Sequence, residues 1–143
     1  AGTQTDHLSA FWDVLPTVAE LAGQPVPDAI DGVSFVPTLL GKQGQKEHEY
    51  LYWEFHEKKG RVALRQGQWK AVRYDVAVDP DSPLELFDLS TDPGEAVNVA
   101  DQHPEVVAKM NAQIKNARTA SKLPKFNFPL VRKGGSGGGS QKK

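Results

Sequence analysis

The chain has 143 residues, enough for one domain with a modest hydrophobic core. Its 17 basic and 18 acidic residues nearly balance, and no stretch concentrates basic with aromatic residues, so nucleic acid is not an expected partner. The absence of cysteine excludes a disulfide scaffold, a thiolate metal site and a cysteine nucleophile. No apolar run approaches the roughly 20 residues that span a bilayer, so no membrane partner is expected.

The first predicted element is a helix that begins after Asp13, a residue type that favours helix N-caps. Apolar residues at helical spacing make one face of this helix: Val14, Leu15, Val18, Leu21 and Ala22. Gly23 is expected to end it, because glycine readily adopts the left-handed conformation found there. Phe11 and Trp12, just before the cap, are interpreted as a packed anchor rather than as ligand contacts.

A turn at residues 31–34 is expected to lead into a short helix over residues 35–40, which Gly41 ends. The charged segment 42–49 is predicted to be a flexible loop. Three histidines are interpreted as surface or turn residues: His7, His48 and His103. No two histidines have the i, i+4 spacing of a zinc site on a helix, so the sequence indicates no such site.

Four strands are predicted in the middle of the chain, where runs rich in aromatic and β-branched residues are separated by turn residues. They cover residues 50–55, 61–65, 69–74 and 84–89. Short turns between neighbouring strands indicate antiparallel pairing. A last helix is expected from about Pro104 to about Ser121. The buried stripe of that helix is predicted to be Val106, Val107, Met110, Ile114 and Ala117.

The predicted fold class is therefore α+β: a four-stranded antiparallel sheet packed against a long C-terminal helix, with an N-terminal helix. Residues 1–121 are expected to form the folded region, and residues 122–133 an extended tail. Residues 134–143 consist of a Gly/Ser linker and a polar end, a composition typical of engineered linkers.

Five segments follow one another in an order that resembles a known family. They are DVLPTVAELAG (13–23), the segment from Pro27 to Phe35, YLYWEF (50–55), ALRQGQWKAV (63–72) and ELFDLSTDPGEAVNVA (85–100). Together they resemble the C-terminal subdomain of the type I sulfatases, formylglycine-dependent members of the alkaline-phosphatase superfamily. The resemblance covers roughly residues 5–120, and its last segment is the most specific.

The resemblance implies a C-terminal fragment of a sulfuric ester hydrolase, acting on a sulfated carbohydrate or an aryl ester. The family's nucleophile is a formylglycine made from Cys or Ser within C/S-x-P/A-x-R, and its metal is calcium. Neither can be placed on this chain, whose serines lack the pattern, so no catalytic or metal residue is predicted. The chain alone is expected to be inactive, and its implied partner is the missing N-terminal catalytic domain. The parent is implied to be exported (periplasmic or secreted) or lysosomal.

The loop FHEKKGR (55–61) is the candidate for substrate contact, because a rigid sheet positions the side chains of its connecting loops. The candidate substrate-binding residues are His56, Glu57, Lys58 and Arg61. They offer donors, an acceptor and cations that suit the hydroxyls or sulfate oxygens of a sulfated glycan. A solvated hairpin tip is the alternative interpretation of this loop.

Two alternatives to the sulfatase fragment stay open. One is an isolated carbohydrate-binding or interaction module, which the polar loop would favour. The other is one segment of a cut or circularly permuted sulfatase, in which the Gly/Ser segment 134–140 would join the old termini. A tag remnant is the simpler interpretation of that segment, and Ala rather than Met at residue 1 fits a cut in a longer protein.

Overall fold

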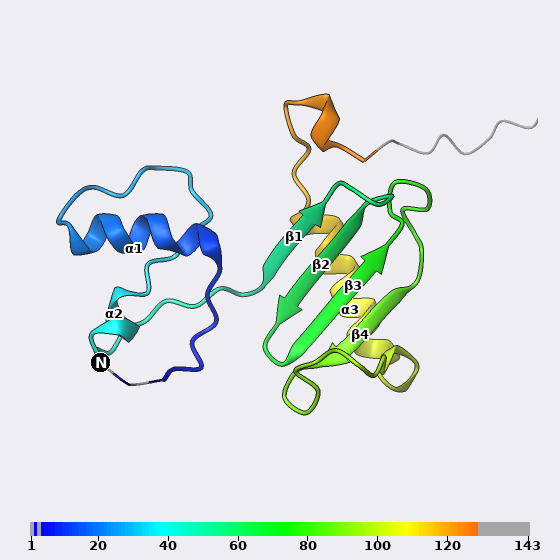
Figure 1. Cartoon of the computed structure of the whole chain (residues 1–143), viewed down its shortest axis with the longest axis horizontal. Coiled ribbons are helices and arrows are strands. Elements are labelled where there is room, and N and C mark those ends of the chain that lie inside the picture. The colour runs from blue at the N-terminus through cyan, green and yellow to red at the C-terminus, as the bar shows by residue number, and fades with distance from the viewer. Residues whose placement is uncertain (1, 3, 129–143) are drawn as a thin grey trace, which may run out of the picture. The chain divides into compact units, whose positions relative to one another are not determined.

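The computed structural model describes residues 2 and 4–128 of the chain. The chain divides into two compact units, Ala1–Leu51 and Tyr52–Lys143. The first unit carries short helices and the second carries the sheet (Figure 1). The two units are described in turn.

The N-terminal unit contains a 3-10 turn, η1 (Phe11–Asp13), followed directly by α1 (Val14–Leu21), and later by α2 (Val36–Leu39). Gly23 adopts a positive φ of 65° just after α1, as the sequence predicts for its C-terminal stop. The second helix is shorter than the expected 35–40, and Gly41 follows it with a φ of 63°. Both predicted helices are therefore confirmed, each with its glycine stop.

The prediction that Asp13 caps α1 is wrong. Its backbone is helical, with φ −77° and ψ −15°, and its side chain makes no capping hydrogen bond to α1. Because Asp13 closes the preceding 3-10 turn, its carboxylate points back toward residue 10. Oδ2 accepts a hydrogen bond of 2.7 Å from the Ala10 amide, and Oδ1 accepts one of 2.8 Å from the Val33 amide.

The predicted packing of Phe11 is also wrong, because 90% of this side chain is exposed. The predicted apolar face of α1 is exposed in the same way, and the buried residues of the helix are Pro16 and Thr17. The hydrogen-bonding face of α1 is turned toward the 31–35 segment: Thr17 Oγ1 accepts a hydrogen bond of 3.1 Å from the Phe35 amide. That choice leaves the leucine-rich face on the outside.

The second unit is built on a four-stranded sheet in the order β1-β2-β3-β4. The strands are β1 (Leu51–Phe55), β2 (Arg61–Gln66), β3 (Trp69–Tyr74) and β4 (Leu84–Asp88). The arrows of neighbouring strands in Figure 1 point in opposite directions, and β2–β3 and β3–β4 are paired antiparallel. The predicted antiparallel sheet is confirmed. Short connections favour antiparallel pairing, because each strand then returns beside the strand before it.

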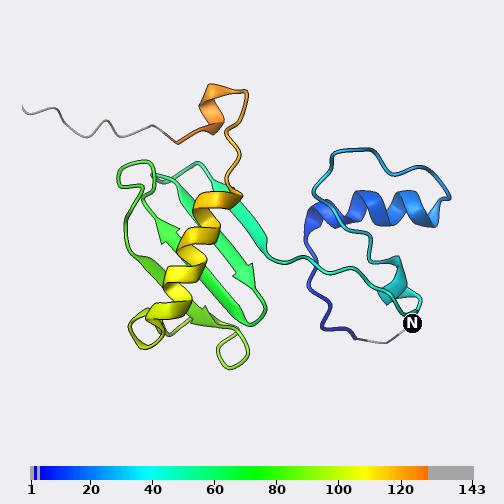
Figure 2. The ribbon, with the colours of Figure 1, turned by 180° about the vertical axis from the view of Figure 1, so that it is seen from behind.

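Helix α3 (Pro104–Ala117) covers one face of this sheet, as the view from behind shows (Figure 2). The core between them is apolar and consists of Val62, Leu64, Ala71, Leu84, Leu86, Met110 and Ile114. The helix ends at Ala117 rather than near Ser121, because Arg118 turns to extended geometry with ψ 120°. With this sheet and helix, the predicted α+β fold class is confirmed.

A short 3-10 turn, η3 (Pro124–Phe126), lies within the segment predicted as a tail. Asn127 holds the start of this segment, donating from Nδ2 to the Ser121 carbonyl at 2.8 Å. The rest of the predicted tail and the Gly/Ser segment, residues 129–143, lie outside the described residues.

The Asp-Pro-Gly turn after β4 fastens the next segment onto the edge of the sheet. Asp92 Oδ2 accepts a hydrogen bond of 2.9 Å from the Val97 amide, which closes the turn. Asn98 Oδ1 then accepts from the Leu86 amide at 3.0 Å, and the Val99 amide donates to the Leu86 carbonyl at 2.8 Å. The outer edge of β4 therefore has hydrogen-bonding partners at its centre, which limits pairing with other chains.

Candidate functional site

The 56–61 loop is a tight turn with an unusual backbone. Lys58, Lys59 and Gly60 all have positive φ, at 51°, 67° and 80°. The Gly60 amide donates to the Glu57 carbonyl at 2.9 Å and closes the turn. Glu57 and Lys58, two of the predicted substrate-binding residues, are exposed at its tip.

His56 is directed away from the loop tip, toward Phe128. The two rings stack with centroids 4.6 Å apart and planes 21° apart. His56 Nε2 also lies 3.2 Å from Glu54 Oε2. Gly60 is required beside this stack, because a Cβ there would lie 2.5 Å from Phe128 Cε1.

Arg61 lies on the sheet face opposite α3. Its Cζ is 5.1 Å from the centre of the Tyr74 ring, a distance at which a guanidinium is attracted to the ring face. The two residues are direct partners across β2 and β3. The structure therefore separates the four predicted substrate-binding residues: Arg61 lies on the sheet, Glu57 and Lys58 at the tip, and His56 against Phe128.

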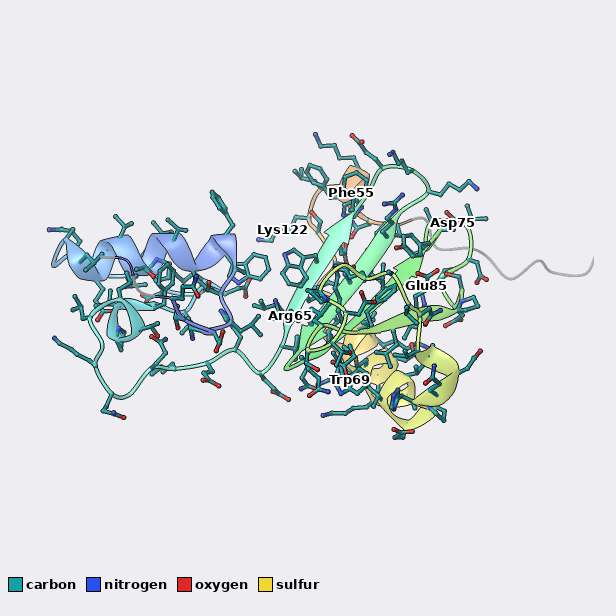
Figure 3. All side chains as sticks on the ribbon, turned by 60° about the horizontal axis from the view of Figure 1, so that its bottom comes forward. Phe55, Arg65, Trp69, Asp75, Glu85 and Lys122 are labelled. Carbon is teal, nitrogen blue, oxygen red and sulfur yellow. The ribbon has the colours of Figure 1, made fainter. Side chains whose placement is uncertain are left out.

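A hollow of about 320 Å³ lies on this sheet face, with Arg61 in its wall. Trp53, Phe55 and Tyr74 line it and are 36%, 46% and 37% exposed. Phe55 and Arg65 mark opposite ends of the neighbouring strands β1 and β2 (Figure 3). Partly exposed aromatic side chains beside a guanidinium form a surface that suits ligands with both apolar and anionic groups.

Lys70 and Glu95 form an ion pair at the same hollow. Glu95 belongs to the Asp-Pro-Gly turn and has a positive φ of 56°. The ion pair ties this turn to β3. The pair also neutralises Lys70, so Arg61 is the better candidate for contact with an anion.

Sequence reasoning missed the three aromatic side chains of the hollow. The signal was available for Tyr74: a two-residue turn at Gly67 and Gln68 places it directly opposite Arg61. The contribution of Trp53 and Phe55 depends on how β1 lies beside β2, and the longer 56–60 loop does not fix that register.

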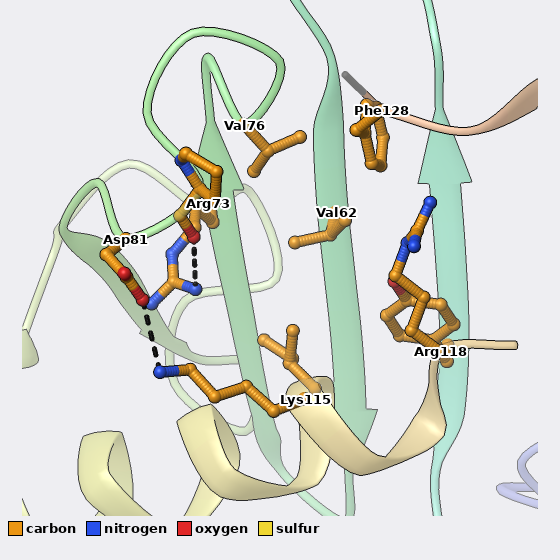
Figure 4. A pocket seen from close by; sticks show the side chains of 10 residues that line it. Val62, Arg73, Val76, Asp81, Lys115, Arg118 and Phe128 are labelled. Carbon is orange, nitrogen blue, oxygen red and sulfur yellow. Dashed lines mark hydrogen bonds and ion pairs between the residues drawn. The ribbon is translucent and has the colours of Figure 1, made fainter. Parts of the chain in front are cut away.

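A second cavity, also of about 320 Å³, lies between the sheet and the C-terminal end of α3 (Figure 4). Val62, Val76, Ile114 and Phe128 give it an apolar lining. Its charged groups already have partners: Lys115 lies 3.1 Å from Asp81, and Arg118 Nε lies 3.0 Å from Glu54 Oε1. This cavity is therefore less suited than the open-face hollow to bind an anion.

Arg73 lines the second cavity and is 5% exposed. Its guanidinium donates to the Ser82 carbonyl at 2.6 Å, the Pro80 carbonyl at 3.0 Å and Asn111 Oδ1 at 3.0 Å. Burial lowers the pKa of Arg73, and the charges of Asp81 and Asp79 oppose that effect. Arg73 thus joins the loop before β4 to α3 and has a structural role.

Tyr52 lines the same cavity and donates from its hydroxyl to Glu54 Oε1 at 2.8 Å. Burial raises the pKa of Tyr52 far above its ordinary value, and the hydrogen bond and charge of Glu54 act in the same direction. Tyr52 therefore keeps its proton at physiological pH and serves as a donor rather than as a base.

Within the described residues, no three His, Cys, Asp or Glu side chains gather into a group that could hold a metal ion. Calcium takes six to eight oxygen ligands, and carboxylates are prominent among them, together with carbonyl groups and waters. The side chains described here therefore do not fit a calcium site.

His48 was predicted to be a surface or turn residue, and this prediction is wrong. Its Nε2 lies 2.8 Å from Asp13 Oδ1, and its side chain is only 10% exposed. The fully buried Asp13 carboxylate thus joins three segments, through Ala10, Val33 and His48. Local sequence patterns could not find this pair, because its members are 35 residues apart.

The fold and the hollow together define a small α+β domain built on an antiparallel meander, with a helix on one face and an aromatic and basic surface on the other. Residues 1–120 match the family described as "N-sulphoglucosamine sulphohydrolase, C-terminal". The chain belongs to this sulfatase family, which is part of the alkaline-phosphatase-like superfamily. It corresponds to the C-terminal subdomain of a sulfatase.

Relatives with known names support this membership. Arylsulfatase A of Bos taurus is 35% identical over 132 residues, covering 78% of this chain and 26% of the relative. Arylsulfatase K of Rattus norvegicus is 32% identical over 142 residues, covering 92% of this chain and 23% of the relative. The solved structure of a 2-O GAG sulfatase superposes with a TM-score of 0.64 at 30% identity, covering 73% of this chain and 23% of that one. The chain thus spans about a quarter of the length of these relatives.

Proposed function

We propose that this chain serves as the C-terminal part of a sulfatase that hydrolyses sulfate esters of a carbohydrate, and that its open-face hollow contacts the saccharide. The observation that carries the proposal is Arg61 held over Tyr74 in a hollow that Trp53 and Phe55 also line. Aromatic faces pack against the apolar side of a sugar ring, and a guanidinium binds sulfate oxygens with charge-assisted hydrogen bonds. One of the related solved structures is that of a 2-O GAG sulfatase, which supports this substrate class.

The rest of the 56–61 loop is proposed to widen this contact. Glu57 and Lys58 are exposed at its tip, where they are free to meet a longer chain of sugars. His56 is held by Phe128 and Glu54 and would fix the base of the loop. We therefore place the principal anion contact at Arg61 and supporting roles at His56, Glu57 and Lys58.

The chemistry of hydrolysis is proposed to come from the missing N-terminal catalytic domain. The family implies a bound calcium ion and a formylglycine nucleophile, and that domain would hold both. The described residues do not fit the calcium site, and the sequence holds no cysteine, so this chain is proposed to be inactive alone. The parent is proposed to be exported or lysosomal. No helix among residues 2 and 4–128 has the length and apolar content to cross a membrane.

A titration of the chain with a sulfated disaccharide tests the saccharide contact. We expect NMR shifts at Arg61, Tyr74 and Trp53 that saturate, and about ten-fold weaker binding in Arg61→Gln, corresponding to one lost charge-assisted contact. Lys59→Gln is the matched control, since it removes one charge from the same loop at an exposed residue that pairs only weakly with Asp75, at 3.6 Å. His56→Ala should weaken binding less than Arg61→Gln. Equal effects of Arg61→Gln and Lys59→Gln would mean that the disaccharide binds through non-specific attraction to positive charge, and not through a specific contact with Arg61.

An assay with an aryl sulfate and calcium tests the proposed inactivity. The pure chain should show no turnover above buffer. Calcium-dependent turnover by a sample whose intact mass matches 143 residues would contradict the proposal.

A further inference from the structure

The segment that follows α3 returns to the 56–61 loop and is held at both ends. At its start, Arg118 Nε lies 3.0 Å from Glu54 Oε1 on β1. At its end, Phe128 stacks on the His56 ring, and Figure 4 shows Arg118 and Phe128 on the same side of the cavity. Arg118 Cζ is 5.4 Å from the centre of the Phe128 ring, which joins the two ends. Residues 118–128 therefore form a strap that is fastened to β1 and to the loop after it.

Phe128 occupies a socket that the loop leaves open for it. A Cβ at Gly60 would lie 2.5 Å from Phe128 Cε1, 2.8 Å from Phe128 Cδ1 and 2.9 Å from Val76 Cγ2. The Phe128 ring thus fills the space that a side chain at position 60 would need. His56 forms a second wall of the socket, and its buried Nδ1 has no hydrogen-bond partner among the described residues. Stacking on Phe128, together with the contact to Glu54, therefore fixes the imidazole.

The loop needs such support because its backbone is strained. Lys58 and Lys59 adopt left-handed conformations, with φ of 51° and 67°, which residues with a Cβ rarely adopt. The Val76 amide donates to the Gly60 carbonyl at 3.3 Å and ties the loop to the next segment. Phe128 lies beside this tie. A strained turn persists only where the surrounding structure holds it, and the Phe128 ring is part of that structure.

We propose that Phe128 is a positioning residue for the saccharide contact. In its socket it holds the 56–61 loop in one conformation, and so it fixes Arg61, which follows Gly60 directly, over the Tyr74 ring. Phe128 lines the cavity on the α3 side of the sheet, so it acts through the loop and not by touching the ligand. This inference rests on the proposed function, because Arg61 is the proposed anion contact. When the loop samples several conformations, the affinity falls with the fraction that holds Arg61 correctly.

The first experiment measures the loop itself, by NMR on the whole chain without saccharide. In Phe128→Ala, the His56 ring protons should lose the ring-current shift of the stacked ring, and the Gly60 amide should exchange about ten-fold faster. Phe126→Ala is the matched control, because it removes a ring of the same strap that meets His56 edge-on at 6.1 Å, and it should change both signals much less. Amides of β3 should exchange as in the parent. Unchanged signals in Phe128→Ala, or equal acceleration throughout β3, would overturn the inference.

A substitution on the other side of the socket provides an independent test. Gly60→Ala adds a Cβ in the space of the ring, so it should release Phe128 and shift the His56 ring protons as Phe128→Ala does. Gly67→Ala is the control for backbone strain alone, since Gly67 has a φ of 55° and no atom within 4 Å of an added Cβ. Adding Phe128→Ala to Gly60→Ala should shift His56 little further. Fully additive shifts would mean that the two residues act independently, and the socket would be refuted.

The titration with a sulfated disaccharide then connects the loop to the ligand. Phe128→Ala should weaken binding about three-fold, and it should have no further effect in the Arg61→Gln variant, because positioning acts through Arg61. Binding that responds to Arg61→Gln but not to Phe128→Ala overturns the inference and leaves the proposed function intact. If the parent does not bind while Phe128→Ala still releases the loop, the proposed function is contradicted and the strap is confirmed as the support of the loop.

Discussion

The buried carboxylate of Asp13 joins three segments of the N-terminal unit. Burial alone would raise the pKa of this carboxyl, but hydrogen bonds from the Val33 and Ala10 amides and from His48 outweigh it, so the pKa lies below its ordinary value. A lowered folded-state pKa stabilises the fold above the unfolded pKa of about 3.9, and that stability is lost as pH falls through the folded pKa.

Asp13→Asn should therefore change both the stability and its pH dependence. An amide cannot serve both partner amides as the carboxylate does, so we expect a loss of about 1–3 kcal/mol at neutral pH. Hydrogen exchange at the Val33 amide, measured between pH 3 and pH 6, checks this. In the parent, protection should fall at the acid end, and in Asp13→Asn it should be low throughout. An acid response of equal size in both would mean that another group is responsible.

Gly32 is the residue that lets the 31–35 segment approach η1. A Cβ at this position would lie 2.3 Å from the Trp12 carbonyl oxygen and 2.9 Å from Pro16 Cγ. Since the nearest atom is backbone, Gly32→Ala should cost about 1–3 kcal/mol. Gly94→Ala is the matched control, because its nearest neighbour would be 3.8 Å away. Urea unfolding of both variants checks the difference, and equal midpoints would show that the segment moves aside freely.

At the scale of elements, the sheet and α3 enclose most of the buried apolar side chains among the described residues. Leu86 is fully buried between them, so Leu86→Ala should lower the free energy of unfolding by about 2–5 kcal/mol. Val97→Ala removes an apolar side chain that is 57% exposed and should change it by less than about 0.5 kcal/mol. Similar midpoints for the two variants in urea would contradict the packing of α3 on this face.

The elements themselves could be predicted from the sequence because their signals are local. The alternation of β2 and β3, the two-residue turn between them and Pro104 at the start of α3 each depend on neighbouring residues. The Asp13–His48 pair and the hollow beside Arg61 could not be predicted in the same way. Each brings together side chains from separate segments, and the positions of those segments depend on tertiary packing.

The orientation of α1 shows a second limit. The spacing of Leu15, Val18 and Leu21 correctly predicts a helix with one apolar face. It does not say which partner covers that face, and the assumption that Phe11 packs nearby failed because the unit uses Asp13 and Thr17 for its inner contacts. Helical periodicity reports that a face is apolar, while its cover can belong to another part of the protein.

At the scale of the whole chain, the two units should differ in stability. In the described part of the N-terminal unit, hydrogen bonds at Asp13 and Thr17 hold the segments together. The second unit has an apolar core that includes Leu64, Leu86 and Met110. A unit of about 50 residues with few buried apolar side chains is marginal in water.

Hydrogen exchange followed by mass spectrometry tests this difference on the intact chain. Amides of α1 should exchange through openings of low free energy, and amides of β2 and β3 should be the most protected, because local opening exposes less apolar surface in the first unit. Equal protection of α1 and β3 in the isolated chain would mean that the first unit is stable by itself, and its exposed apolar face would then need no partner for folding.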